Sequence, residues 1–237
     1  MNEIVAENTV NEEILYSNLL TKVTKIKYAE DIRSGKLYMN KLSYFRKLEH
    51  TGIGDEREGF LCESTSGYIM LNGEIVGECS NITTFLDFPI FCATAVSFTE
   101  TDYNRGKFVV SKQLLKEFMY DENEQYVLLI INGEEFQKRV RDALAKARLN
   151  GFWGYVEYTN SKKLPASDEL YQIAFRKRTT YSYQQEWRLV IDAHADDHFE
   201  FDIGDISDIS WIIPIDNSDK ELTIEVKMNE RDERQRD

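Results

Sequence analysis

A central β-strand is predicted by the stretch Ile90-Phe-Cys-Ala-Thr-Ala-Val-Ser-Phe98. An apolar run that is nearly continuous is typical of a strand that is buried on both faces. Upstream of it, Tyr68-Ile-Met-Leu71 and Glu74-Ile-Val76 flank the dipeptide Asn72-Gly73. Asn-Gly between two apolar runs is a strong signal for a β-hairpin. We therefore expect a hairpin that leads into the central strand.

Further segments on both sides of this strand alternate apolar and polar residues, which indicates a sheet. We expect strands at 21–28, 36–45, 125–131, 155–158, 187–191, 199–203 and 209–214. Helical patterns indicate a leading helix within 10–20, a short helix at 29–34 and a long helix over 133–150 that ends at Gly151. The predicted fold is α+β: a single domain whose mixed, mostly antiparallel sheet is split around a cleft and flanked by a few helices.

This pattern divides the chain into three parts. Residues 1–20 form an N-terminal extension or short helix, and residues 21–226 form the single α+β catalytic-like domain. Residues 227–237 are almost all charged, and we expect this tail to be disordered.

Composition narrows the class of protein. The chain has 29 basic and 42 acidic residues, a net charge of -13, and 42% hydrophobic residues. This favours a folded soluble domain and argues against a broad face that binds duplex nucleic acid. A local basic pocket stays open, since Lys162, Lys163 and residues 176–178 form a dense basic region.

The sequence favours a cytoplasmic protein with no membrane partner. No apolar run approaches 18 residues, and the acidic N-terminus does not resemble a signal peptide. The chain has three cysteines, Cys62, Cys79 and Cys92, and no Cys-x-x-Cys motif. An odd count without this spacing argues against a disulfide framework or a cysteine zinc site. No P-loop, Gly-x-Gly-x-x-Gly, Gly-x-Ser-x-Gly or His-Glu-x-x-His motif is present, so no metal site is predicted.

Glu186 is the main candidate for a catalytic residue. It lies at the start of the strand in Tyr181-Ser-Tyr-Gln-Gln-Glu-Trp-Arg-Leu-Val-Ile191, next to Trp187. A carboxylate held there can act as a general base, or stabilise a positively charged transition state. Arg188 lies two residues on, so it shares the strand face of Glu186. A plain ion pair of Glu186 with Arg188, or with the basic residues at 176–178, fits the same pattern.

Two other blocks carry polar candidates. Tyr44 and Arg46 combine an aromatic ring with a guanidinium, which suits stacking on a nucleobase or nicotinamide, although Tyr38 in the same block fits the core better. The loop Gly54-Asp-Glu-Arg-Glu-Gly59 carries three carboxylates. It could bind a hard cation or position an amine or guanidinium of a substrate. A solvated charged turn is the favoured interpretation of this loop.

Two long blocks resemble the ADP-ribosyltransferase superfamily, including its toxin and antiphage branches. The first is Tyr28-Ala-Glu-Asp-Ile-Arg-Ser-Gly-Lys-Leu-Tyr-Met-Asn-Lys-Leu-Ser-Tyr-Phe-Arg46, which is followed by residues 54–59. The second is Phe175-Arg-Lys-Arg-Thr-Thr-Tyr-Ser-Tyr-Gln-Gln-Glu-Trp-Arg188. The same blocks are similar to phage and bacterial proteins with an early Gly-Lys-Leu-Tyr strand and a late Glu-Trp-Arg strand.

The resemblance implies an enzyme that cleaves the nicotinamide–ribose bond of NAD, its substrate. Glu186 would be the late glutamate that orients the ribose and stabilises the oxocarbenium ion, and Tyr44 would stack on nicotinamide. Lys27 or Tyr28 would stand on the first strand where the family has His or Arg. Thr94-Ala-Val-Ser97 matches the family's Ser-Thr-Ser motif only loosely.

Arg46 or Arg57 would hold the pyrophosphate, and Arg188 would complete the cofactor-binding set. The ADP-ribose would pass to a protein or nucleic acid acceptor in phage–host conflict, with no metal required. Two alternatives stay open. One is a non-enzymatic acidic phage or bacterial protein that binds and inhibits a host or defence factor. The other is a module that has lost catalysis but still senses a nucleotide.

Overall fold

The computed structural model describes residues 15–48, 53–98, 107–110, 112–119, 121, 123–161, 167–215 and 222–225. Its strands are β1 (Leu15–Lys25), β2 (Lys36–Lys41), β3 (Phe60–Leu71), β4 (Glu74–Phe85), β5 (Pro89–Phe98), β6 (Lys107–Val110), β7 (Tyr126–Asn132), β8 (Asn150–Tyr155), β9 (Glu157–Tyr158), β10 (Arg176–Lys177), β11 (Glu186–Asp192), β12 (His198–Asp202), β13 (Ser210–Pro214) and β14 (Leu222–Glu225). Its α-helices are α1 (Ile26–Arg33), α2 (Leu42–Arg46), α4 (Lys112–Phe118) and α5 (Gly133–Ala147), and its 3-10 helices are η2 (Ser167–Phe175) and η3 (Thr179–Gln184).

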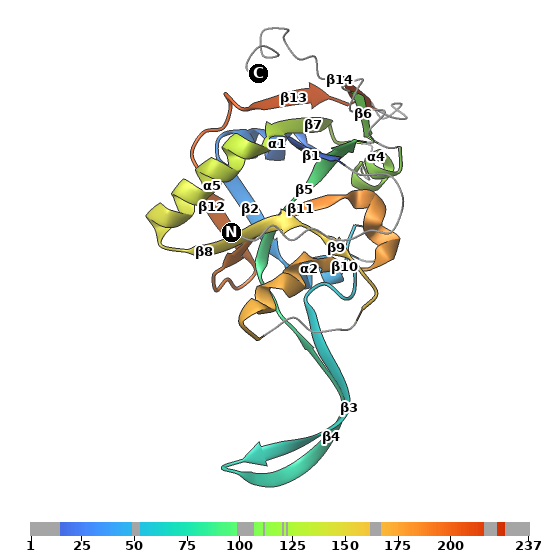
Figure 1. Cartoon of the computed structure of the whole chain (residues 1–237), viewed down its shortest axis with the longest axis vertical. Coiled ribbons are helices and arrows are strands. Elements are labelled where there is room, and N and C mark those ends of the chain that lie inside the picture. Colours follow the sequence, from blue (N-terminus) through green and yellow to red (C-terminus); the bar gives the residue numbers. More distant parts are fainter. Residues whose placement is uncertain are drawn as a thin grey trace, which may run out of the picture.

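Strand β5 is the centre of an eight-stranded antiparallel sheet (Figure 1). One edge of β5 pairs with β11, which in turn pairs with β8. The opposite edge is shared, because β2 pairs with Pro89 and Ile90 while β1 pairs with the segment from Thr94 to Phe98. The predicted α+β fold with a mostly antiparallel sheet is therefore confirmed, as is the central strand.

Both faces of this sheet are covered. On one face, α1 and α5 pack against Phe91, Trp187 and Leu189 in the largest hydrophobic core. On the other face, two smaller cores lie under α4 and under α2 with η2. Strand β11 is buried at every position from Glu186 to Ile191, so Glu186 and Arg188 lie inside the molecule. Among the described residues, no helix has the length and apolar character needed to span a membrane.

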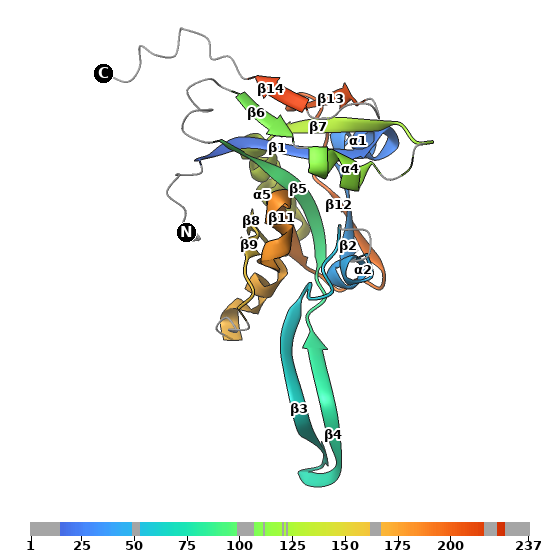
Figure 2. The same cartoon turned by 90° about the vertical axis from the view of Figure 1, so that its right-hand side faces the viewer.

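A long hairpin, residues 60–85, projects from the body of the molecule (Figures 1 and 2). We call it the arm. Its turn is Asn72-Gly73, with φ values of 52° and 87°. Two successive positive φ values are what a type I′ hairpin turn requires, and Asn-Gly meets this requirement best. The hairpin that the sequence predicts at this dipeptide is confirmed.

Several predicted boundaries near the N-terminus are wrong. Of the expected leading helix at 10–20, residues 15–20 belong to β1, and residues 10–14 lie outside the described residues. Strand β1 ends at Lys25 instead of Tyr28, because Ala29 and Ile32, three residues apart, bury one face of helix α1 in the core. Strand β1 also starts before residue 21, so the folded domain includes part of the expected extension.

Two further elements differ from the prediction. The strand expected at 36–45 ends at Lys41, because fully buried Leu42 starts helix α2. Helix α5 ends at Ala147 instead of running to Asn150. The residue after it, Arg148, takes the left-handed conformation (φ 57°, ψ 40°) that ends many helices.

Arg148 gives a direct test of this helix end. A left-handed conformation costs a residue with a Cβ roughly 1 kcal/mol that glycine avoids. Arg148→Gly should therefore raise the free energy of unfolding by about 1 kcal/mol, as measured by urea denaturation. Lys146→Gly, inside the last helical turn, should lower it by about 1 kcal/mol. A loss of stability in both variants would contradict the assignment of Arg148 as the helix-ending residue.

Candidate functional site

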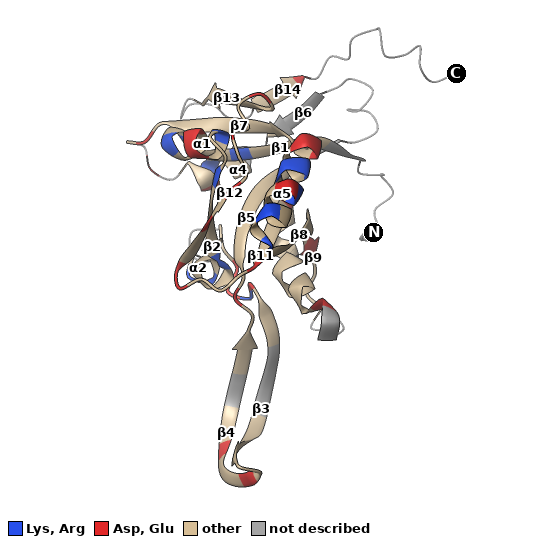
Figure 3. Cartoon of the chain, turned by 90° about the vertical axis from the view of Figure 1, so that its left-hand side faces the viewer, with Lys and Arg blue, Asp and Glu red and all other residues tan. Residues whose placement is uncertain are grey.

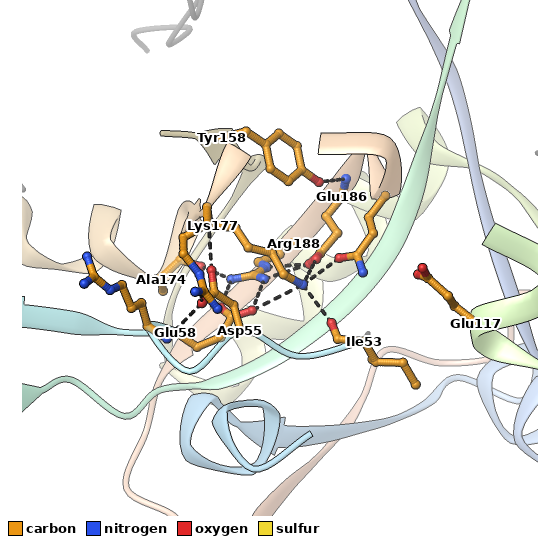
Figure 4. Close-up of polar contacts among 12 residues, drawn as sticks. Ile53, Asp55, Glu58, Glu117, Tyr158, Ala174, Lys177, Glu186 and Arg188 are labelled. Atoms are coloured by element: carbon orange, nitrogen blue, oxygen red, sulfur yellow. Dashed lines mark hydrogen bonds and ion pairs between the residues drawn. The ribbon is translucent and has the colours of Figure 1, made fainter. Parts of the chain in front are cut away.

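The candidate site is built around Glu186, the first residue of β11. The chain enters this strand through Gln185, whose left-handed backbone (φ 44°) turns it out of η3. The Gln185 carbonyl accepts a hydrogen bond from the Ala95 amide, and Glu186 pairs with Thr94 of β5. The Glu186 amide donates to the Tyr158 hydroxyl at 2.8 Å. These contacts fix the backbone of Glu186, whose side chain turns toward η2 and the loop before the arm (Figure 4).

Four buried charged side chains form one network around Glu186 (Figure 4). Arg188 Nη1 and Nη2 donate to the two carboxylate oxygens of Glu58 at 2.8 and 2.9 Å. Arg188 Nε donates to Glu186 Oε2 at 2.8 Å, and Lys177 Nζ donates to Glu186 Oε1 at 2.6 Å. Lys177 Nζ also lies 3.4 Å from Glu58 Oε1. The network holds two carboxylates and two cations, so its formal charge is balanced.

Neutral groups satisfy the remaining donors. Lys177 Nζ donates to the Ile53 carbonyl at 2.8 Å and to Gln184 Oε1 at 2.6 Å. Arg188 Nη1 donates to the Ala174 carbonyl at 2.6 Å. Buried charges are tolerated only when they are paired and hydrogen-bonded, and this network meets both conditions.

The network sets the ionisation of its members. Burial alone would raise the pKa of Glu186, but the charges and hydrogen bonds of Arg188 and Lys177 outweigh burial and lower this pKa from 4.5 to about 2. Burial would lower the pKa of Lys177, and the nearby Glu186 and Glu58 instead raise it. Burial, followed by the charge of Glu186, raises the pKa of the Tyr158 phenol. At neutral pH the site therefore holds a fixed carboxylate beside a neutral phenol.

The loop Gly54–Gly59 supplies Glu58 and Asp55, both fully buried. A Cβ on Gly54 would lie 1.7 Å from the Phe45 carbonyl oxygen, so only glycine fits there. Gly59 has φ +72°, and its carbonyl accepts from the Leu86 amide. The favoured interpretation as a solvated turn is wrong for Asp55 and Glu58. The loop instead positions guanidinium groups, and these are the protein's own.

Asp55 forms a second ion pair next to the network. Its Oδ1 accepts from Arg178 Nε at 2.7 Å, and its Oδ2 accepts from the Arg178 amide at 2.8 Å. Beside this pair lies a small pocket of about 50 Å³, whose lining includes Asp55, Arg57, Phe60, Arg176, Lys177 and Arg178. Four of these six side chains are cationic, but Arg176, Lys177 and Arg178 are each paired with a carboxylate, so most of this positive charge is balanced. A local basic pocket in an acidic protein was one of the possibilities left open by the sequence.

Three predicted cofactor-binding residues, Arg188, Arg46 and Arg57, lie at the Glu186 network or at the pocket beside it. Arg188 contacts Glu186 directly, and Arg46 Nη1 donates to the Glu58 carbonyl at 2.7 Å. Arg57 is exposed at the basic pocket, with its guanidinium 5.7 Å from the Phe60 ring centroid. Tyr44 lies on α2, 44% exposed, with its ring edge-on to Phe45.

Other predicted residues lie apart from the Glu186 network. Lys27 and Tyr28 belong to helix α1 instead of the first strand, and the buried face of α1 joins the core on the opposite side of the sheet. The Lys27 ammonium lies 4.8 Å from the Tyr28 ring centroid. Tyr38, expected in the core, is 54% exposed and stacks on His198 at 4.3 Å. It sits on the outer face of β2, whose inner face is formed by Leu37 and Met39.

Lys22 of β1 bonds to β5 at the point where β1 and β2 separate along its edge. On the shared edge of β5, Cys92 lies between the residues that pair with β2 and those that pair with β1. Its carbonyl accepts a hydrogen bond from Lys22 Nζ at 2.7 Å. Burial lowers the pKa of Lys22, and burial raises the pKa of the Cys92 thiol to about 12. Cys92 therefore stays a neutral thiol at physiological pH, and it is a poor nucleophile.

The plain ion pair that the sequence left as an alternative for Glu186 is present: the structure pairs Glu186 with Arg188 and with Lys177 of the basic run 176–178. Sequence reasoning missed two members of the site, Gln184 and Tyr158, which contact Lys177 and Glu186. Tyr158 carries no local signal, because it reaches Glu186 through the fold and lies 28 residues away from it in sequence. Gln184 gives no signal either, because a glutamine in a polar turn has the same pattern whether or not it accepts from a buried lysine.

Comparisons with known proteins give no further guidance. No protein-family model matches the chain, and no curated protein or solved structure is significantly similar to it. The resemblance to ADP-ribosyltransferases therefore stays a prediction.

Glu58 should be essential to stability. Glu58→Gln removes one charge from a buried network and leaves Arg188 short of a partner. Breaking one side of a buried ion pair costs about 3–5 kcal/mol, so urea denaturation should show a loss of that size. Glu56→Gln, in the same loop but with a side chain that is 59% exposed, should change stability by less than about 0.5 kcal/mol. Equal losses in the two variants would contradict the network.

The low pKa of Glu186 predicts how stability depends on pH. Between about pH 4.5 and pH 2, the unfolded chain binds a proton at Glu186 that the native protein does not. Stability should therefore fall as the pH drops through this window. Glu186→Gln should be less stable than wild type at pH 7, and the difference should shrink toward pH 2. Urea denaturation across this range measures both effects, and a pH-independent difference would show that Glu186 is not held ionised.

Proposed function

We propose that this chain is an ADP-ribosyltransferase-like enzyme that cleaves the nicotinamide–ribose bond of NAD at Glu186. ADP-ribose would then pass to a protein or nucleic acid acceptor, in the setting of phage–host conflict. The observation that carries the proposal is the state of Glu186: a buried carboxylate that is held ionised, with its backbone fixed at the start of a central strand.

The chemistry suits such a carboxylate. Departure of nicotinamide leaves positive charge on the ribose, so a fixed negative charge stabilises the transition state more than the ground state. The bond between C1 of the ribose and the nicotinamide nitrogen breaks, and that nitrogen keeps the electron pair. The acceptor nucleophile then forms the new bond to the same carbon and loses its proton.

Access to Glu186 requires one contact to open. The residue is 8% exposed, and both of its carboxylate oxygens are occupied. Lys177 is the partner that can leave, because it keeps the Ile53 carbonyl, Gln184 and Glu58 when it releases Glu186 Oε1. A ribose hydroxyl would take its place on Oε1, while Arg188 continues to hold Oε2.

The basic pocket supports the same proposal. Lys177 belongs both to the Glu186 network and to the pocket lining, so the two sites are adjacent. Arg57, Arg176 and Arg178 line the pocket, and guanidinium groups suit a pyrophosphate. A pyrophosphate there would compete with Glu157 for Arg176 and with Asp55 for Arg178. From helix α2, Tyr44 would stack on the nicotinamide, and Arg46 would help to hold the pyrophosphate.

The test is an assay for nicotinamide release from NAD. Glu186→Gln should lower the rate by about 100-fold or more, as loss of a group that stabilises transition-state charge does. Circular dichroism must show that Glu186→Gln is folded. Arg57→Ala changes an exposed side chain, so it should raise the KM for NAD without unfolding the chain. Glu200→Gln, at a side chain on β12 that is 78% exposed, is the matched control and should retain the wild-type rate.

Two outcomes would reject the proposal. One is no release by folded wild-type protein in the presence of candidate protein and nucleic acid acceptors. The other is an equal rate in wild type and folded Glu186→Gln. Binding of NAD or ADP-ribose by calorimetry without any release would instead favour a module that senses a nucleotide.

A further inference from the structure

The arm is the part of the molecule that the Glu186 site leaves unexplained. In the part of the chain that the structure describes, β3 and β4 pair only with each other. Both outer edges of the arm therefore present backbone groups that can pair with another strand. Two-stranded hairpins are marginally stable in water by themselves, so a projecting hairpin of this length suggests a partner.

The tip of the arm is apolar on both faces. Six large apolar side chains there are more than half exposed: Tyr68 (64%), Ile69 (53%), Met70 (60%), Leu71 (63%), Ile75 (60%) and Val76 (59%). Successive residues of a strand point to opposite faces, so the run from Tyr68 to Leu71 places apolar groups on each face. Contiguous exposed apolar surface marks an interaction site. A partner must therefore enclose the tip, as a groove does, and a flat surface would cover only one face.

The charge of the arm narrows the class of partner. Residues 60–85 contain Glu63, Glu74 and Glu78 and no lysine or arginine. Figure 3 shows acidic residues and no basic ones on the described part of the arm. Anionic membranes and nucleic acids attract basic segments, so an arm without a cation fits neither. A second copy of this chain also carries a net charge of -13, which opposes self-association.

We propose that the arm is a docking element for a basic protein, whose apolar groove is bordered by lysine or arginine side chains. The apolar tip enters the groove, and Glu74 and Glu78 beside the turn meet the basic border. The free strand edges add backbone hydrogen bonds to the partner. This interaction goes beyond the reaction at Glu186 and does not depend on it.

The test combines capture with a defined binding measurement. Full-length protein is used to capture partners from a lysate of the cells that encode it, and each protein retained is purified and measured by calorimetry. The arm variant Ile69→Ser/Leu71→Ser should bind at least about tenfold more weakly than wild type, as loss of buried anchor residues does. Glu74→Gln/Glu78→Gln should weaken binding and reduce its dependence on salt.

A matched control separates the arm from exposed apolar surface in general. Trp211 and Ile213 on β13 are 51% and 43% exposed, and Trp211→Ser/Ile213→Ser should bind like wild type. The proposal is overturned if purified partners bind the arm variant as tightly as wild type, or if they are acidic. It is also overturned if no partner is retained, if wild type dimerises through the arm in sedimentation experiments, or if the arm binds anionic vesicles or nucleic acid instead.

Discussion

The buried ion pair between Glu58 and Arg188 holds the loop 54–59 against strand β11. Arg188 comes from the central sheet and Glu58 from the loop before the arm, and their bidentate pair joins segments that are far apart in the chain. Because unpaired buried charges are costly, neither segment can move alone. Glu186 and Lys177 add one negative and one positive charge, so the buried charges balance. Their contacts fix the positions of β10, β11 and the loop relative to one another. The glycines at 54 and 59 allow the loop to come close enough for this pairing.

The same network both suits and restrains chemistry at Glu186. Its cations keep the carboxylate ionised, which a transition state with positive charge requires. The same cations balance the negative charge of Glu186 and occupy both of its carboxylate oxygens. Under the proposed function, a substrate would compete with these groups for the carboxylate. Lys177, which donates to Glu186 Oε1, has other acceptors, whereas Arg188, which donates to Oε2, is held in place by Glu58. Exposing Oε1 therefore costs less free energy than exposing Oε2. Under the proposed function, Oε1 would therefore be the oxygen that meets substrate, while Oε2 stays with Arg188.

Local patterns in the sequence were sufficient for much of the sheet. The apolar run of β5 and the Asn-Gly turn predicted both elements correctly, because burial on two faces and positive φ leave a local signature. The pairing of Glu186 with Arg188 also follows from strand period alone. The roles of Asp55 and Glu58 could not be predicted this way, because their partners lie more than 120 residues away in sequence. Charges between glycines have the same pattern whether they face water or a buried arginine, and only the fold separates the two cases.

The base of the arm and the Glu186 network are connected through Arg46. Arg46 donates to the Glu58 carbonyl, and its guanidinium lies 4.4 Å from the ring centroid of Phe85 at the end of β4. Phe85 in turn packs edge-on against Phe60, the first residue of β3. Both strands of the arm are thus anchored through Arg46 to the residue that holds Arg188. A displacement of the arm base has to be absorbed by these contacts, and Arg46 and then Glu58 are the charged groups on that path. The arm therefore meets the rest of the molecule at the ion pair that keeps Glu186 in place.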